Sequence, residues 1–171
     1  MQGTTESYEG MRNLISILLA IVVLCGCGPK VYDFDTLICL EEPGPGDLYC
    51  LTKEGHPITG VANSYYEIGT IKSSVILKDG KPDGPFLMYY ENGTLKVECL
   101  YDNGKAVGYL KGYYENGTRY YKMPYTDSKE DGVQFWYYEN GDLQSEITKK
   151  DGVILSSECW NEDGNKIPCE D

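Results

Sequence analysis

A 24-residue repeat constrains this chain more than any other feature. The motif Tyr-Tyr-Glu-x-Gly starts at Tyr65, Tyr89, Tyr113 and Tyr137, and a second glycine recurs with the same step at Gly60, Gly84, Gly108 and Gly132. A degraded fifth copy, Trp-Asn-Glu-Asp-Gly at 160–164, falls one residue short. Both the motif and the second glycine recur four times with the same 24-residue spacing. We therefore predict an array of one short repeated unit, in which stacked neighbours bury a shared core.

Each unit is predicted to be a β-hairpin. In the second unit the strands are residues 85–91 and 95–101, and Asn92-Gly93 between them is the favoured pair for a two-residue type I′ turn. Such a turn fixes which residues share a face. The predicted pairs on the apolar face are Tyr90 with Leu95, Met88 with Val97, and Phe86 with Cys99.

The same register sends one tyrosine of each doublet inward and its neighbour toward water. The outward tyrosines form a column of candidate binding residues: Tyr65, Tyr89, Tyr113 and Tyr137. Tyrosine suits the binding of protein strands, peptides or sugars, and the alternative is that these rings only stabilise an exposed sheet face. In the fourth unit the predicted inward residues are Trp136, Tyr138, Leu143 and Ile147. Cys99 shares its column with apolar residues, so we expect a small core residue rather than a catalytic thiol.

The predicted fold class is all-β, with tandem hairpins forming one elongated, twisted antiparallel sheet of up to about ten strands. No helical periodicity follows residue 27, so almost no helix is expected there. Turn signals also separate the hairpins at Asp79-Gly80, Asn103-Gly104 and Asp151-Gly152. The corresponding pair Asp127-Ser128 lacks glycine and should be looser. Pro124 falls inside a predicted strand and should interrupt its ladder.

Residues 1–26 are predicted to be a signal peptide, with a true start at Met11 as an alternative. The apolar run 14–24 is too short to span a bilayer comfortably and follows Arg12. The sequence Leu-Cys-Gly-Cys at 24–27 resembles the lipobox of bacterial lipoproteins, which implies cleavage before Cys27 and a lipid on its sulfur. The implied location is the bacterial cell envelope, membrane-anchored. An uncleaved anchor helix or a buried core helix is the competing interpretation.

The remainder of the chain divides into three predicted parts. Residues 27–47 form the lipidated tether and an N-terminal cap, in which residues 36–40 add a first strand or cover the open edge. Residues 48–158 form the hairpin repeats, and residues 159–171 form a C-terminal cap. Candidate disulfide partners are Cys39 with Cys50 and Cys159 with Cys169, because each spacing closes a short terminal loop.

Composition excludes several functions. The formal net charge of −12 argues against nucleic acid, because phosphate binding needs a basic surface. The single histidine, His56, precedes a proline without triad context, and no Cys-x-x-Cys pair follows residue 27. We therefore expect no catalytic residues, no cofactor and no metal site. The repeated glutamates beside the turns are better explained as solvated residues than as binding groups.

The motif Tyr-Tyr-Glu-Asn-Gly-(Thr/Asp)-Leu-Lys, followed by Asn-Gly-Lys-x-x-Gly, resembles the MORN repeat, and most closely its bacterial variant. The likeness covers about residues 60–164 and implies tandem hairpins in a single twisted sheet. Eukaryotic MORN proteins are mostly scaffolds and membrane-associated adaptors, and some bacterial members are classed as antitoxins. The resemblance implies a lipid-anchored, non-enzymatic module for an unidentified protein partner, held to the membrane through Cys27. A carbohydrate or cell-wall binding module, with a glycan partner, and an antitoxin-like inhibitor are the alternatives.

Overall fold

The computed structural model describes residues 29–41 and 48–169. The predicted signal peptide and Cys27 lie outside these residues, and so do residue 28 and residues 42–47 of the predicted tether and cap. The chain divides into two units, Met1–Lys30 and Val31–Asp171, and the following account concerns the second. Within the described ranges, no helix has both the length and the apolar character needed to cross a membrane.

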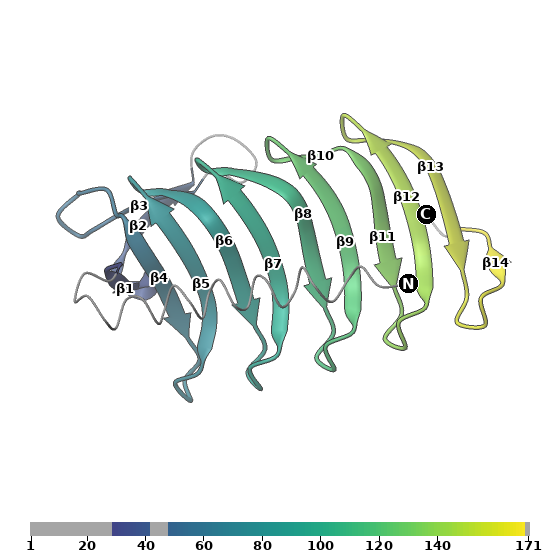
Figure 1. The fold of residues 1–171 in the computed structure, drawn as a ribbon, viewed down its shortest axis with the longest axis horizontal. Helices are drawn as coiled ribbons and strands as arrows, with labels where there is room; N and C mark the ends of the chain where they lie inside the picture. Colours follow the sequence, from purple (N-terminus) through teal and green to yellow (C-terminus); the bar gives the residue numbers. More distant parts are fainter. Residues whose placement is uncertain (1–28, 42–47, 170–171) are drawn as a thin grey trace. The chain divides into compact units, whose positions relative to one another are not determined.

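Twelve strands of the described residues form one sheet, in which neighbours along the chain lie side by side (Figure 1). The strands after the first follow in chain order: β4 (Gly60–Tyr65), β5 (Ile71–Lys78), β6 (Lys81–Tyr89), β7 (Leu95–Asp102), β8 (Lys105–Tyr113), β9 (Arg119–Thr126), β10 (Lys129–Glu130), β11 (Gly132–Tyr137), β12 (Leu143–Lys150), β13 (Val153–Trp160) and β14 (Lys166–Ile167). All these pairs are antiparallel, and only β1 (Val31–Asp33) joins the edge of β4 in parallel. The prediction of an all-β hairpin array is confirmed.

The turns inside the hairpins differ from the prediction. Gly93 N donates to Tyr90 O at 2.9 Å and Tyr90 N donates to Thr94 O at 2.8 Å, so the loop has three residues, of which only Gly93 has positive φ (84°). This is a type I turn followed by a bulge. The first unit makes the same loop with Ile68 in the place of Asn92, and a β-branched residue strongly opposes the positive φ of a type I′ turn.

The longer loop shifts the register beside it. Leu95 pairs with Tyr89 instead of Tyr90, and a bulge then restores the predicted pairs Met88–Val97 and Phe86–Cys99. The fourth unit shows the same shift, because Leu143 pairs with Tyr137. The predicted pairing is therefore wrong for the residues next to the turn and confirmed for the rest of the second hairpin.

Type I′ turns do occur, at the opposite ends of the strands. Asp79 and Gly80 both have positive φ (50° and 86°) between the paired residues Lys78 and Lys81. The pair Asp127-Ser128, which lacks glycine, keeps the same shape, with φ of 50° and 60°. The expectation that it would be looser is wrong, because two hydrogen bonds join this turn to β8. Ser128 N donates to Ala106 O, and Ala106 N donates to Ser128 Oγ, each at 3.0 Å.

The glycine that recurs outside the Tyr-Tyr-Glu-x-Gly motif, Gly132 in the last unit, lies where the hydrogen-bonded ladder between consecutive hairpins is irregular. Gly132 has φ of 118°, and a Cβ atom there would lie 3.1 Å from Pro124 Cγ. The pairing of β9 with β11 covers Tyr121 and Lys122, and β10 pairs with residues 125 and 126. Pro124 falls between the two paired stretches, so the predicted interruption of the ladder is confirmed.

The second tyrosine of each doublet joins one hairpin to the next. Its hydroxyl donates to a backbone carbonyl 22 or 23 residues further along, at 2.7 to 2.9 Å: Tyr66 to Tyr89 O, Tyr90 to Tyr113 O, Tyr114 to Tyr137 O, and Tyr138 to Trp160 O. All four rings are half-buried. This bond supplies a partner for a hydroxyl that would otherwise lose its water contacts on burial.

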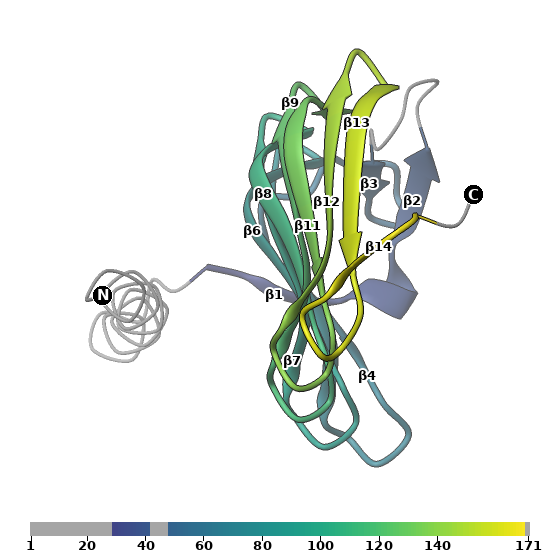
Figure 2. The same ribbon diagram turned by 90° about the vertical axis from the view of Figure 1, so that its right-hand side faces the viewer.

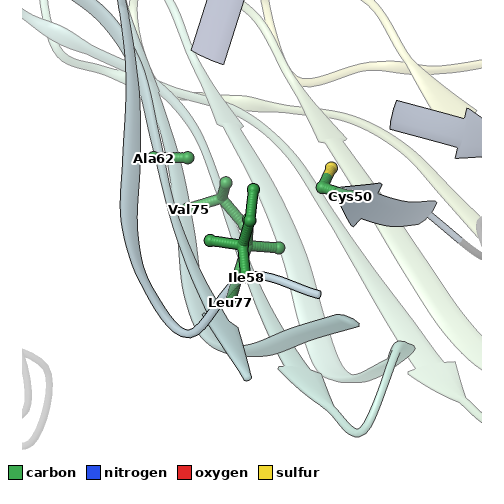
Figure 3. Close-up of a cluster of buried hydrophobic side chains, with 5 residues drawn as sticks. All are labelled: Cys50, Ile58, Ala62, Val75 and Leu77. Carbon is green, nitrogen blue, oxygen red and sulfur yellow. The ribbon is translucent and has the colours of Figure 1, made fainter. Parts of the chain in front are cut away.

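Two strands outside the large sheet cap its first hairpins. The strands β2 (Ile38–Glu41) and β3 (Leu48–Leu51) pair with each other, and the disulfide between Cys39 and Cys50 joins them. Figure 2 shows them on one side of the large sheet. They bury a cluster of Cys50, Ile58, Ala62, Val75 and Leu77 (Figure 3). Residues 36–40 take neither of the two predicted roles, because β2 pairs only with β3 and the two strands cover the face of the first hairpins, while β1 pairs with the edge strand β4. The large sheet includes residues from Gly60 onward, and residues 48–51 belong to the β2–β3 pair.

The other end of the sheet carries only a short strand. β14 pairs with Cys159 and Trp160 at the end of β13, and the predicted disulfide between Cys159 and Cys169 closes this segment. The helical content of the described residues is a single 3₁₀ turn, Phe34–Thr36, which precedes β2. We call the sheet face that contains Val75, Cys99 and Met123 the inner face, and the opposite face the outer face.

Candidate interaction site

The inner face is hollowed beyond the β2–β3 cap. A cavity of about 630 Å³ opens over β7 to β10 and the turn after β12, and its apolar lining consists of Cys99, Tyr101, Ala106 and Leu110. Tyr125 and Glu130 form one wall, and the rim comes from the turns that contain Ser128 and Gly152. These residues lie on one face because β7, β8 and β9 are paired antiparallel neighbours in which inward residues alternate with outward ones.

Cys99 is buried and makes no disulfide, as predicted. Its thiol donates a long hydrogen bond of 3.6 Å to Leu100 O. Burial raises the pKa of this thiol, so the reactive thiolate is disfavoured near neutral pH. Cys99 therefore contributes apolar lining to the cavity rather than a nucleophile.

The wall of the cavity is polar but neutralised. Glu130 accepts hydrogen bonds from Lys149 Nζ at 2.7 Å, from Gln134 Nε2 at 2.8 Å and from Tyr125 Oη at 3.0 Å. The hydrogen bond from Lys149 lowers the pKa of Glu130, and burial opposes this change. Burial together with Glu130 raises the pKa of Tyr125. At neutral pH the carboxylate and the ammonium group compensate each other, and Lys129 and Asp151, which also line the cavity, have opposite charges. The cavity therefore suits an uncharged apolar group.

An aromatic cluster lies on the same face, nearer the three-residue loops. The ring of Tyr121 lies 5.3 Å from that of Trp136, and the ring of Tyr120 lies 5.4 Å from both. The ring of Tyr114 lies 4.8 Å from that of Tyr120, tilted by 50°, and the side chain of Tyr120 is exposed. Tyr121 covers Gly112, where a Cβ atom would collide with its ring. Aromatic faces that are partly open to solvent are common anchors in binding surfaces.

The sequence interpretation missed this cluster. Its signal was the pair Tyr120-Tyr121, because the first, second and fourth units have Lys72-Ser73, Lys96-Val97 and Gln144-Ser145 at the same places. The third unit is thus the one that places two aromatic side chains after its loop. Trp136 completes the cluster because it pairs directly with Tyr121 across β9 and β11.

The predicted tyrosine column does not form an exposed surface. Tyr65 is 43% exposed, but Tyr113 is only 7% exposed. The hydroxyl of Tyr113 donates to Glu98 Oε1 at 2.7 Å, and Lys111 Nζ donates to the same oxygen at 2.8 Å. The expectation that every first tyrosine of a doublet faces water is therefore wrong, because the hydroxyl of Tyr113 is hydrogen-bonded to the buried carboxylate of Glu98 on the outer face. A binding role for Tyr65, Tyr89, Tyr113 and Tyr137 stays a prediction.

Across residues 29–41 and 48–169 there is no group of three or more histidine, cysteine, aspartate or glutamate residues that could hold a metal ion. His56 lies exposed in the loop after β3.

Three segments match a known family, the MORN repeat variant: residues 82–103, 106–127 and 130–151. These three segments are similar to the MORN repeat variant, and together they cover less than half of the chain. Each MORN match contains one hairpin and ends at the first residue of a type I′ turn, at Asn103, Asp127 or Asp151. MORN repeats generally act as protein-interaction scaffolds and are typically non-catalytic. No curated protein matches the chain in sequence.

Proposed function

We propose that this protein is a lipid-anchored, extracytoplasmic MORN-repeat module that binds a protein partner through its inner face and catalyses no reaction. The observation that carries the proposal is the cavity lined by Cys99, Ala106 and Leu110, next to the exposed ring of Tyr120. An apolar cavity bordered by aromatic side chains matches the way interfaces bury a few anchor residues of the partner.

The partner's chemistry follows from the cavity and the charge. The Glu130–Lys149 pair leaves the wall of the cavity without net charge, so the anchor that enters should be an uncharged apolar side chain. The whole chain carries a formal net charge of −12, which attracts positively charged partners over distance. The proposed partner segment therefore has an apolar side chain flanked by lysine or arginine.

Photo-crosslinking in the cells that make the protein tests this proposal. A photo-reactive residue at position 110 should give a specific adduct, because Leu110 lines the cavity. The same residue at position 100 is the control, because Leu100 is exposed on the outer face. Adducts of equal yield and mass at both positions, or none at position 110, would count against an inner-face partner.

The location outside the cytoplasm is supported by two features. The disulfides Cys39–Cys50 and Cys159–Cys169 persist best in an oxidising compartment. The segment 14–27 has an apolar run followed by the lipobox-like Leu-Cys-Gly-Cys. Mass spectrometry of the protein from membranes should give an N-terminal peptide that begins at Cys27 and carries acyl chains. Cys27→Ser should abolish the acyl mass, whereas the control Cys25→Ser should keep it; an unmodified peptide that includes residues 14–24 would contradict the lipid anchor.

Carbohydrate binding is the second candidate function, and the aromatic cluster favours it. Sugars stack on exposed aromatic rings, and Tyr120 is exposed and lies 5.4 Å from Trp136 in an edge-to-face pair. Saturable binding to isolated cell-wall glycan that is lost in Tyr120→Ala would support this candidate over a protein partner. An antitoxin-like inhibitor would use the same inner face, and a toxin gene beside the gene for this chain would favour it.

A further inference from the structure

The third repeat unit has two positive charges at places where the other units have none. Arg119 takes the place of an isoleucine or a leucine, which the other units have at residues 71, 95 and 143. Lys122 takes the place of a serine or a glutamate, at residues 74, 98 and 146. The chain has 27 acidic residues against 15 lysines and arginines, so this pair of cationic replacements in one unit runs against its composition.

The pairing of β8 with β9 brings these charges together on the outer face. Lys122 lies directly opposite Lys111, and the next pair, across a bulge, is Tyr113 with Arg119. The two β8 residues both donate to Glu98 on the outer face, and residues that pair across a ladder share a face, so the two β9 cations lie there as well. Like charges directly opposite each other in a sheet are destabilising, so the arrangement of the two lysines has a cost.

The carboxylates of the described residues do not neutralise the two β9 cations. None of them forms an ion pair with Arg119 or Lys122. Burial lowers the pKa of Lys122, and the nearby charges of Arg119 and Lys111 lower it further. Nε of Arg119 is buried and has no hydrogen-bond partner in the described part of the chain. The cations therefore repel one another, and an anion bound beside them would relieve that repulsion.

Two tyrosine rings border the cations. Lys122 Nζ lies 4.0 Å from the centre of the Tyr109 ring. Arg119 Cζ lies 6.0 Å from the centre of the Tyr137 ring. A ring attracts a cation through its quadrupole and leaves the charge of the cation unchanged. Because Tyr109 is 46% exposed, the surface beside Lys122 is open to a ligand from solvent.

We propose that Arg119 and Lys122 form a binding site for a carboxylate group on the outer face of the third unit. The same face already holds one carboxylate in a similar way, because Glu98 Oε1 accepts from Lys111 Nζ at 2.8 Å and from Tyr113 Oη at 2.7 Å. Arginine adds a planar fork that can donate two parallel hydrogen bonds to a carboxylate. The site lies on the face opposite the cavity, so it does not depend on the proposed inner-face function.

The carboxylate has two sources, a free organic acid or an acidic side chain of a peptide, and two probes distinguish them. Nuclear magnetic resonance of the full chain in neutral detergent, with isotope-labelled lysine, follows the side-chain signal of Lys122. Succinate should shift this signal in a saturable way, with a dissociation constant on the order of 1–10 mM, and sodium chloride at the same ionic strength should not. The peptide acetyl-Gly-Glu-Gly-Glu-Gly-amide should compete with succinate. At least tenfold tighter binding of the peptide identifies a protein segment as the source, and equal binding identifies a free acid.

Three variants that each remove one positive charge separate this site from the general charge of the protein. Arg119→Leu and Lys122→Ser should each weaken succinate binding at least tenfold, the second being followed on the signal of Lys111. Lys96→Gln is the matched control and should leave binding unchanged, because Lys96 lies over the ring of Tyr90 in the second unit. Each new residue occurs at the same place in another unit, at 95, 74 and 144, so circular dichroism should show that all three variants fold.

Three results would overturn the carboxylate site. The first is a Lys122 signal that neither succinate nor the peptide shifts in a saturable way. The second is unchanged succinate binding in Arg119→Leu, and the third is equal weakening in Lys96→Gln, which would show attraction to the overall charge instead of a site. None of these results bears on the inner-face partner, which the crosslinking at position 110 tests separately.

Discussion

The hydroxyl of Tyr90 donates a 2.8 Å hydrogen bond to the backbone carbonyl of Tyr113 in the next hairpin. The contact recurs in all four doublets, so the second tyrosine of each doublet joins neighbouring repeats by a hydrogen bond rather than serving as a surface group. In repeat arrays, stability depends on such contacts between nearest neighbours.

Replacing Tyr90 by phenylalanine should remove this hydrogen bond between neighbouring hairpins. We expect a loss of about 1 kcal/mol in the free energy of unfolding. Urea unfolding followed by circular dichroism would measure it. Tyr109→Phe is the matched control, because Tyr109 is exposed on the outer face and its ring contact with Lys122 does not need the hydroxyl. Equal losses in the two variants would refute the role of the Tyr90 hydroxyl.

Gly112 should not tolerate alanine, because the new methyl group would meet the ring of Tyr121. We expect Gly112→Ala to cost about 1–3 kcal/mol, the usual range for overpacking. The double variant Gly112→Ala/Tyr121→Val should recover part of that loss by removing the obstructing ring. Thermal unfolding of the single and double variants would give the comparison, and additive losses would show that the two positions do not clash.

The Glu130–Lys149 pair should make stability depend on pH. Because Lys149 lowers the pKa of Glu130 below its usual 4.5 in the folded state, the pair stabilises the fold above that value and loses its effect as pH falls through the lower, folded-state pKa. Glu130→Gln should therefore cost about 1 kcal/mol at pH 7, and less below pH 4. Urea unfolding of both proteins at several pH values checks this, and a difference that persists unchanged at pH 3 would contradict it.

Removal of the Cys39–Cys50 disulfide should loosen the β2–β3 cap. A bond that closes a loop of this length contributes about 2–4 kcal/mol. In Cys39→Ser/Cys50→Ser, backbone amides of residues 48–51 should exchange hydrogen faster, while those of β7 to β9 should stay protected because their pairing does not involve the cap. Cys159→Ser/Cys169→Ser is the control, since it removes the bond at the other end of the sheet. Faster exchange throughout the array would show that the cap and the repeats unfold together.

The turns illustrate how far local sequence can be interpreted. Asn92-Gly93 and Asn103-Gly104 contain the same two residues, but the first lies in a three-residue loop and the second forms the type I′ turn. Asn92 Oδ1 accepts a hydrogen bond from Thr94 N at 2.8 Å, which stabilises the longer loop. Ile68 at the equivalent place in the first unit was the signal that could have separated the two cases.

The sequence by itself determined the period, the hairpins and the mid-strand pairs such as Phe86–Cys99, and it supplied the candidate cysteine pairs that the structure joins. These features depend on spacing and on the alternation of side chains along a strand, which are local properties. Only the tertiary structure decided which face β2 and β3 cover, that Tyr113 is buried on Glu98, and that Tyr121 and Trp136 meet beside a cavity. Those outcomes depend on contacts between residues 15 or more positions apart, or on a segment outside the repeat, and such contacts form only once the neighbouring strands are in place.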